Sequence, residues 1–372
     1  MRGYQRVLSS LIVAVFALPV LTGCAGVVSQ QTPSDTSPLP DSGVHAWAVG
    51  TYGTIVATTD GGTHWTSQPS GTNHGLAAVS FADASHGWAV GGYPVIGGRR
   101  QRLILATTDG GMGWTPQLKD SGLPLTAVAT ADATHVWVGG GASVPAIRAS
   151  SDGGSTWTTQ YRGTVKGAVD DIAFADNAHG WAVAVLGSWM DANVGVEVLG
   201  TTDSGAHWTI QKTMRGDPYS WSVAFADATH GWIVGTKGGG TKARVWTTSD
   251  GGSTWTLTPT QPKGMIASMD ALACVDPLHV WTGGTSPTPF FRSSDGGQTW
   301  VATTKTLVGV RAMAFGDTSH GWVVTLDGST TRIMATDDGG VTWTRQAKIP
   351  LPGHVRQPGQ NSPQLLDITC LR

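Results

Sequence analysis

The sequence predicts an all-β protein: a seven-bladed β-propeller of four-stranded antiparallel blades, with a ring closed by the C-terminal strand. First, a turn motif of the form Ser/Thr-x-Asp-x-Gly-x-x-Trp occurs seven times, with its aspartates 43 to 51 residues apart. Second, another motif alternates with it along the chain. Third, the segments between the motifs alternate as strands do, and none predicts a convincing helix. A period of this length with short strands is typical of propeller blades.

The turn motif joins two strands. Its aspartate can accept hydrogen bonds from backbone N–H groups of the turn, and its glycine tolerates a positive φ. Seven copies cannot all face one site, so we interpret the aspartates as structural. They are Asp60, Asp109, Asp152, Asp203, Asp250, Asp295 and Asp338. The tryptophans, which we expect to cover the turns, are Trp65, Trp114, Trp157, Trp208, Trp255, Trp300 and Trp343.

The second motif is Phe-x-Asp-x-x-His-Gly-Trp in its full form, as at residues 81–88. Each copy has a histidine two residues before its tryptophan: His45, His86, His135, His179, His230, His279 and His320. These histidines therefore belong to the repeat. Only His74 and His354 lie outside both motifs. No histidine or cysteine cluster has metal-ligand spacing, so we expect no metal and no cofactor.

One blade shows the expected order of strands, at residues 76–81, 87–91, 103–108 and 114–117. Later blades are expected to begin near residues 125, 169, 221, 269 and 310. Residues 44–68 lack a first strand, and residues 365–370 match the first-strand pattern. The C-terminal strand should therefore complete the N-terminal blade, which removes two open sheet edges.

The N-terminal residues predict export. Residues 1–23 have a basic start and an apolar run, as in a signal peptide, and Leu-Thr-Gly-Cys ends the run at Cys24. This pattern resembles a bacterial lipoprotein signal, so we expect Cys24 to be lipidated and the protein to be anchored on the extracytoplasmic side of the cell membrane. Residues 24–43 would be a flexible tether and residues 44–372 the propeller.

Composition narrows the function classes. The formal net charge of −2 gives no electrostatic case for nucleic acid.

Cys274 and Cys370 align with Phe81, an apolar position of the first strand, so we expect both to be free, buried thiols.

The paired motifs carry a family resemblance. The aspartate turns look like Asp-box (BNR) repeats, and together with the Phe-x-Asp-x-x-His-Gly-Trp motif they resemble the photosystem II stability and assembly factor family, over about residues 44–372. The resemblance implies an exported propeller that binds membrane-protein assembly partners and has no catalytic motif. We therefore expect a monomeric, non-enzymatic scaffold for a membrane or exported protein, with a glycan as the alternative ligand.

The topology separates two faces of the disk. The two repeated turns share one face, and the variable loops between second and third strands, with the blade-to-blade connections, share the other. Variable loops on one face are often the binding surface. The candidate residues there are Tyr93, Arg99, Arg100, Arg102, Trp189, Trp221, Arg244, Arg311 and Arg332.

A glycoside hydrolase is the alternative function. A sialidase needs a tyrosine nucleophile beside a glutamate, and Glu197 is the only glutamate in the chain. A pair of catalytic aspartates, as in xyloglucan-type enzymes, is the other possibility. Its candidates lie on expected inner strands, where they could instead form a polar lining of the central channel: Asp170, Asp171, Asp270 and Asp367.

Overall fold

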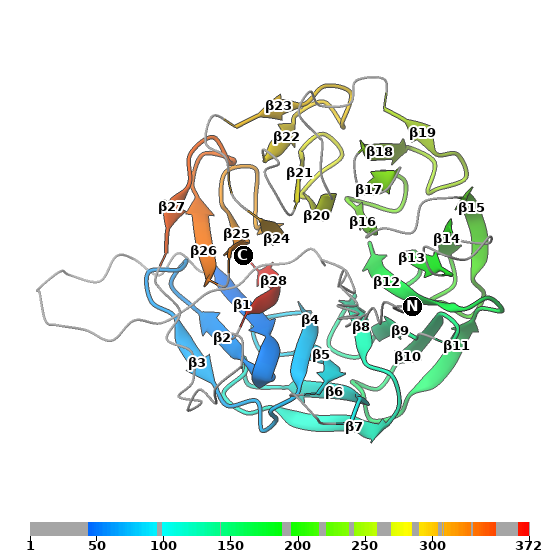
Figure 1. Cartoon of the computed structure of the whole chain (residues 1–372), viewed down its shortest axis with the longest axis vertical. Coiled ribbons are helices and arrows are strands. Elements are labelled where there is room, and N and C mark those ends of the chain that lie inside the picture. Colours follow the sequence, from blue (N-terminus) through cyan, green and yellow to red (C-terminus); the bar gives the residue numbers. More distant parts are fainter. Residues whose placement is uncertain are drawn as a thin grey trace, which may run out of the picture.

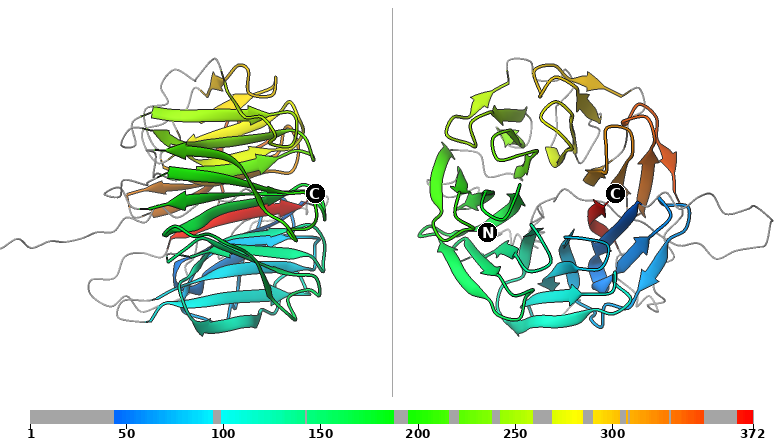
Figure 2. Two further views of the ribbon diagram at one scale, coloured as in Figure 1. Left: turned by 90° about the vertical axis from the view of Figure 1, so that its right-hand side faces the viewer. Right: turned by 180° about the vertical axis from the view of Figure 1, so that it is seen from behind.

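The computed structural model describes residues 44–94, 99–141, 143–187, 195–215, 221–237, 242–258, 269–284, 290–303, 307, 309–328, 330–346 and 364–371. They form seven four-stranded antiparallel sheets arranged as blades around a central axis (Figure 1). Seen edge-on, the strands run between the two faces of a disk (Figure 2). In this part of the chain the one helix is the short 3-10 turn η1 (Thr51–Gly53). No helix among the described residues is long and apolar enough to cross a membrane.

Each blade has four strands from the axis outward, and blades 1 to 7 follow the order of the chain. The innermost strands are β28 (Leu365–Leu371), β4 (Gly75–Phe81), β8 (Leu125–Thr130), β12 (Gly167–Phe174), β16 (Trp221–Phe225), β20 (Met269–Cys274) and β24 (Val310–Phe315). The second strands are β1 (His45–Gly50), β5 (Gly87–Tyr93), β9 (Val136–Gly140), β13 (Gly180–Leu186), β17 (Gly231–Lys237), β21 (Val280–Gly284) and β25 (Gly321–Asp327). The third strands are β2 (Ile55–Thr58), β6 (Gln101–Thr107), β10 (Ala146–Ser150), β14 (Gly195–Thr201), β18 (Lys242–Thr248), β22 (Phe291–Ser293) and β26 (Thr330–Thr336). The outer strands are β3 (Thr66–Gln68), β7 (Thr115–Ser121), β11 (Thr158–Arg162), β15 (Thr209–Arg215), β19 (Thr256–Leu257), β23 (Val301–Ala302) and β27 (Thr344–Arg345).

The C-terminal strand closes the ring, as the sequence predicts. β28 pairs antiparallel with β1 over a register that runs from His45 opposite Leu371 to Gly50 opposite Leu365. Leu365 and Ile368 are fully buried in the cluster that joins blades 1, 2, 6 and 7. The predicted fold class is therefore confirmed, including the shared first blade (Figure 1).

Aromatic rings pack one blade against the next. The indole of Trp47 in blade 1 stacks on Phe81 of blade 2, with ring centroids 3.6 Å apart, and Trp114 meets the same Phe81 edge-on. The same stack recurs in blades 3–4, 4–5 and 6–7. Each aromatic pair adds about 0.5–1.5 kcal/mol to the burial of its area.

The two cysteines of the propeller differ from expectation in part. Cys274 is free and packs half-buried against the core of blades 5 and 6, and its burial raises the pKa of the thiol to about 12. Cys370 takes part in a disulfide, so the prediction of a free thiol is wrong there. Cys370 is half-buried near the end of β28, and its bonded partner lies outside the described residues.

Removing residues 364–372 should destroy the closed ring. The deletion removes the burial of Leu365 and Ile368, and each such side chain contributes about 2–5 kcal/mol. A domain is stable by only about 5–15 kcal/mol, so the truncated protein should be largely unfolded or aggregated at room temperature. Thermal melting and size-exclusion chromatography measure this directly. A truncated protein with an unchanged melting temperature and a monodisperse peak would contradict the closure argument.

Candidate binding surface

The aspartate turns are held by their own hydrogen bonds. In blade 3, the Asp152 Oδ1 accepts from the Ser150 hydroxyl at 2.7 Å and from the Thr156 N–H at 2.8 Å, and Oδ2 accepts from the Thr156 hydroxyl. The Ser150 oxygen in turn accepts from the Gly154 N–H at 2.8 Å. The bonds from Thr156 hold the pKa of Asp152 down at about 2. The bond from the hydroxyl two residues before the aspartate recurs in all seven turns.

The same turns also bind the preceding blade. The Trp47 Nε1–H of blade 1 donates to the Gly110 carbonyl in the turn of blade 2 at 2.9 Å, and the Gln68 amide donates to the same carbonyl at 3.0 Å. Four more second-strand tryptophans do this at the blade junctions that follow them: Trp137, Trp181, Trp232 and Trp281. The aspartate turn therefore fixes a carbonyl that joins two blades.

The second motif forms the other repeated turns on the face of the disk that carries the aspartate turns. In blade 2, Asp83 accepts from the Ser85 and His86 N–H groups at 2.7 and 2.8 Å, and its carboxylate meets the His86 ring nitrogen at 2.9 Å. This turn also binds the aspartate turn of its own blade, because the Gly110 N–H donates to the Ser85 carbonyl. The polar groups of the repeated face thus largely bind one another, which supports the structural interpretation of the seven aspartates. Among the described residues, no three His, Cys, Asp or Glu side chains form a group that could hold a metal ion.

Replacing Asp152 by alanine should lower the melting temperature near neutral pH and leave partner binding intact in the folded fraction. The pKa of Asp152 is lower in the folded protein than the ordinary value of 3.8. Its stabilising contribution is therefore complete above about pH 4 and is lost as the pH falls through about 2. The difference in melting temperature between the two proteins should shrink over that window. A constant difference down to pH 2, or lost binding at full stability, would contradict this role.

On the opposite face, charged and aromatic side chains of blades 1 and 2 lie together. Arg99 and Arg100 are exposed, and the His74 ring contacts the Arg99 carbonyl at 3.4 Å. Gly75, which follows His74, pairs with Tyr93 across β4 and β5. Burial and the nearby Asp170 carboxylate raise the pKa of the half-buried Tyr93, and Arg100 opposes this shift. The predicted residues Tyr93, Arg99 and Arg100 therefore form one local surface with His74.

The other residues predicted to bind a partner differ in how exposed they are and in whether another side chain of the protein binds them. Arg102 is held by Asp120 through two bonds of 2.7 and 2.6 Å, and Arg332 is held by Asp327 at 2.6 Å. Trp221 is 2% exposed and packs on Gly235, so the expectation that it presents a binding surface is wrong. Arg244 and Arg311 are half-buried on blades 5 and 7, away from the arginines of blade 2, and Trp189 lies outside the described residues.

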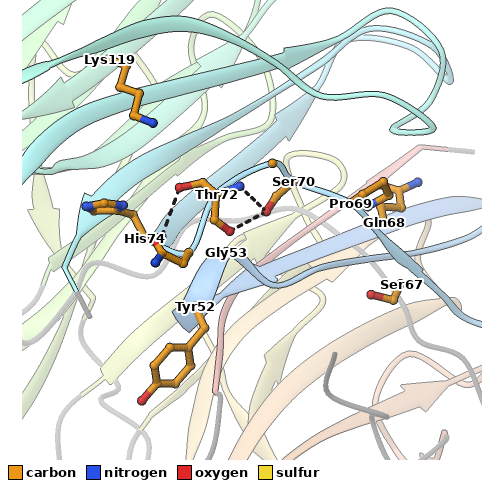
Figure 3. A pocket seen from close by; sticks show the side chains of 11 residues that line it. Tyr52, Gly53, Ser67, Gln68, Pro69, Ser70, Thr72, His74 and Lys119 are labelled. Carbon is orange, nitrogen blue, oxygen red and sulfur yellow. Dashed lines mark hydrogen bonds between the residues drawn. The ribbon is translucent and has the colours of Figure 1, made fainter. Parts of the chain in front are cut away.

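A pocket of about 610 Å³ lies beside this surface, between blades 1 and 2 (Figure 3). Tyr52 and Gly53 come from the loop between β1 and β2, residues 67–74 come from the end of β3 and the connection to β4, and Lys119 comes from β7. Sequence reasoning did not find this pocket, although it set His74 apart from the repeats. The available signal was the run Pro69-Ser70-Gly71-Thr72-Asn73, which differs from every other connection between blades.

The inner-strand aspartates are not an open catalytic pair. Asp171 is fully buried, and its Oδ2 accepts from the Ser222 hydroxyl at 2.7 Å and the Val223 N–H at 2.9 Å, which ties blade 4 to blade 5. Asp367 is also fully buried and accepts from the Val79 N–H at 2.8 Å, which ties blade 1 to blade 2. Burial raises the pKa of Asp171 well above its ordinary value, and Asp367 raises it further. Neither residue lines an open channel as expected; Asp170 is 9% exposed, and the Asp270 side chain lies outside the described part.

Comparison with known proteins gives the fold. No family model and no curated protein matches the chain. A solved structure described as YCF48 from Cyanidioschyzon merolae is 21% identical, with a TM-score of 0.59, and the match covers 86% of this chain and 97% of that one. A second, described as YCF48 bound to D1 peptide, is 17% identical with a TM-score of 0.54, covering 87% and 89%.

An enzyme shares the same architecture. The GH74 xyloglucanase from Xanthomonas campestris is 15% identical with a TM-score of 0.64, and the match covers 89% of this chain and 55% of the enzyme. At these identities the likeness establishes a shared propeller fold and no shared activity. The chain is therefore a seven-bladed propeller similar in structure to YCF48 and to GH74 enzymes.

Proposed function

We propose that this chain is a protein-binding scaffold, held by a lipid on Cys24 at the extracytoplasmic side of the cell membrane, and that it binds an exported or membrane protein with its variable-loop face. One observation carries the proposal: Arg99 and Arg100 are exposed beside Tyr93 and an open pocket, on the face where the blades differ. Arginine and tyrosine are enriched among the residues that dominate protein interfaces. The similar YCF48 propeller bound to D1 peptide adds support from another protein.

A glycoside hydrolase remains the second candidate because the fold is shared with a xyloglucanase. Such an enzyme needs two carboxyl groups on either side of the scissile bond, facing a common cleft. Asp171 and Asp367 are buried and bind backbone N–H groups of neighbouring blades, and Glu197 is half-buried on β14, a third strand. The scaffold therefore accounts for these residues better. Turnover of xyloglucan or a sialoside by the purified protein would favour the hydrolase instead.

Replacing both Arg99 and Arg100 by alanine should weaken capture of the membrane partner at least tenfold and leave the melting temperature nearly unchanged. Both side chains are exposed, and surface substitutions usually change stability by no more than about 0.5 kcal/mol. Arg345→Ala is the matched control, because Arg345 is exposed on the outer strand of blade 7. Capture from solubilised membranes, quantified at two salt concentrations, measures the effect. Equal capture by all three proteins would overturn the assignment of the face.

Replacing Cys24 by serine should release the protein from the membrane fraction, since two acyl chains anchor a protein stably. Peptide mass mapping of the natural protein gives the second readout. A diacylglyceryl thioether on Cys24 is expected; with Cys274 free and three cysteines in the sequence, this lipid anchor and a disulfide between Cys24 and Cys370 exclude each other. Detection of a Cys24–Cys370 disulfide peptide in the mature protein, or membrane retention of Cys24→Ser, would refute the lipid anchor.

A further inference from the structure

The pocket between blades 1 and 2 lies where the outer strand of blade 1 is shorter than that of blade 2. β3 ends at Gln68, and Pro69 follows it directly. Proline has no N–H to donate and cannot continue the ladder, so the chain turns away toward β4. The corresponding outer strand of blade 2, β7, continues to Ser121. Lys119 on this longer strand therefore stands over the space that β3 leaves open (Figure 3).

The floor of the pocket is held by contacts within the chain. The two loops touch at Gly53, where an added Cβ would lie 2.1 Å from the Thr72 carbonyl oxygen. The Ser70 hydroxyl donates to that same carbonyl and accepts from the Thr72 N–H, and the Thr72 hydroxyl accepts from the His74 N–H. Tyr52 holds a left-handed backbone with φ of 60°, a conformation that disfavours a residue with a large side chain. Strain retained in a surface loop is typical of binding sites.

Three exposed polar side chains of this pocket can each donate hydrogen bonds, and the Lys119 ammonium group is a donor only. Lys119, Asn73 and Ser67 are exposed, and their side chains have no hydrogen-bond or ionic partner in the part of the chain that the structure describes. In Figure 3 the Lys119 ammonium group faces the loop that carries Thr72 and His74. The lining contains no Asp or Glu. The nearest acidic neighbour in sequence, Asp120, is already held by two bonds from Arg102.

We propose that this pocket binds a carboxylate group on an extended peptide segment. One ammonium group with neutral donors around it matches a single negative charge. A phosphate carries nearly two negative charges at neutral pH, and the single ammonium group of the lining would balance one of them. A neutral sugar would leave the ammonium group without a counter-charge. The proposal rests on the proposed function, since it names the group by which a protein partner would enter this face.

The experiment uses purified protein and three short peptides: N-acetyl-trialanine as the free acid, the same peptide as its amide, and an amide-capped peptide with one internal aspartate. Titrations followed by two-dimensional NMR give the affinities. The free acid or the aspartyl peptide should bind about tenfold more tightly than the neutral amide, and whichever is preferred identifies the source of the carboxylate. Lys119→Gln should abolish this preference without changing the melting temperature. Lys166→Gln, at an exposed lysine in the connection between blades 3 and 4, should retain it.

The outcomes separate this inference from the proposed function. Equal binding of acid and amide, or a preference that survives Lys119→Gln, would overturn the carboxylate pocket even if Arg99→Ala/Arg100→Ala lost its membrane partner. Binding of glucuronic acid with no binding of either acidic peptide would overturn the peptide assignment. Retained partner capture by the arginine double variant, together with a Lys119-dependent preference for acid, would refute the arginine surface and leave the pocket standing.

Discussion

The hydrogen bond from a second-strand tryptophan to the aspartate turn of the next blade is the interaction on which the ring depends. It needs a carbonyl held at a fixed place, and the aspartate holds it by fixing the turn, as in Gly110 beside Asp109. At four of the five junctions that have this bond among the described residues, the indole also stacks on a phenylalanine of the next blade, as Trp47 does on Phe81. At five of the seven junctions, this bond therefore positions a blade against the one before it, and the residues involved repeat.

Two of the seven junctions lack this bond, and both also lack the stacked phenylalanine. The indole N–H groups of Trp88 and Trp322 have no acceptor within the described residues. The position that holds Phe81 in blade 2 holds Thr130 in blade 3 and Cys370 in blade 1, by the register of the inner strands. At the junction of blades 2 and 3, the Thr130 hydroxyl instead meets the Ser80 hydroxyl of blade 2 at 2.9 Å.

The sequence predicts what repeats, and it fails where two different loops meet. The turn, the strand order and the closure by β28 follow from local rules that operate seven times, so one blade predicts the others. The burial of Trp221 against Gly235 and the disulfide of Cys370 each depend on a single non-repeated contact. The period of the sequence does not predict such contacts. It does not predict the pocket either, because Gly53 and Thr72 meet at one blade junction only.

The repeated contacts lie on one face and the variable loops on the other, which explains how the propeller can carry a site without loss of the fold. The repeated face is occupied by bonds that join blades, so a substitution there changes stability first. On the other face, the chain is free to end an outer strand early, and Pro69 does so after three residues of β3. The resulting space is bounded by a loop that bonds to itself and by Lys119 of the adjacent blade, neither of which supports the ring. The difference in length between β3 and β7 therefore leaves a pocket at this blade junction without disturbing the ring.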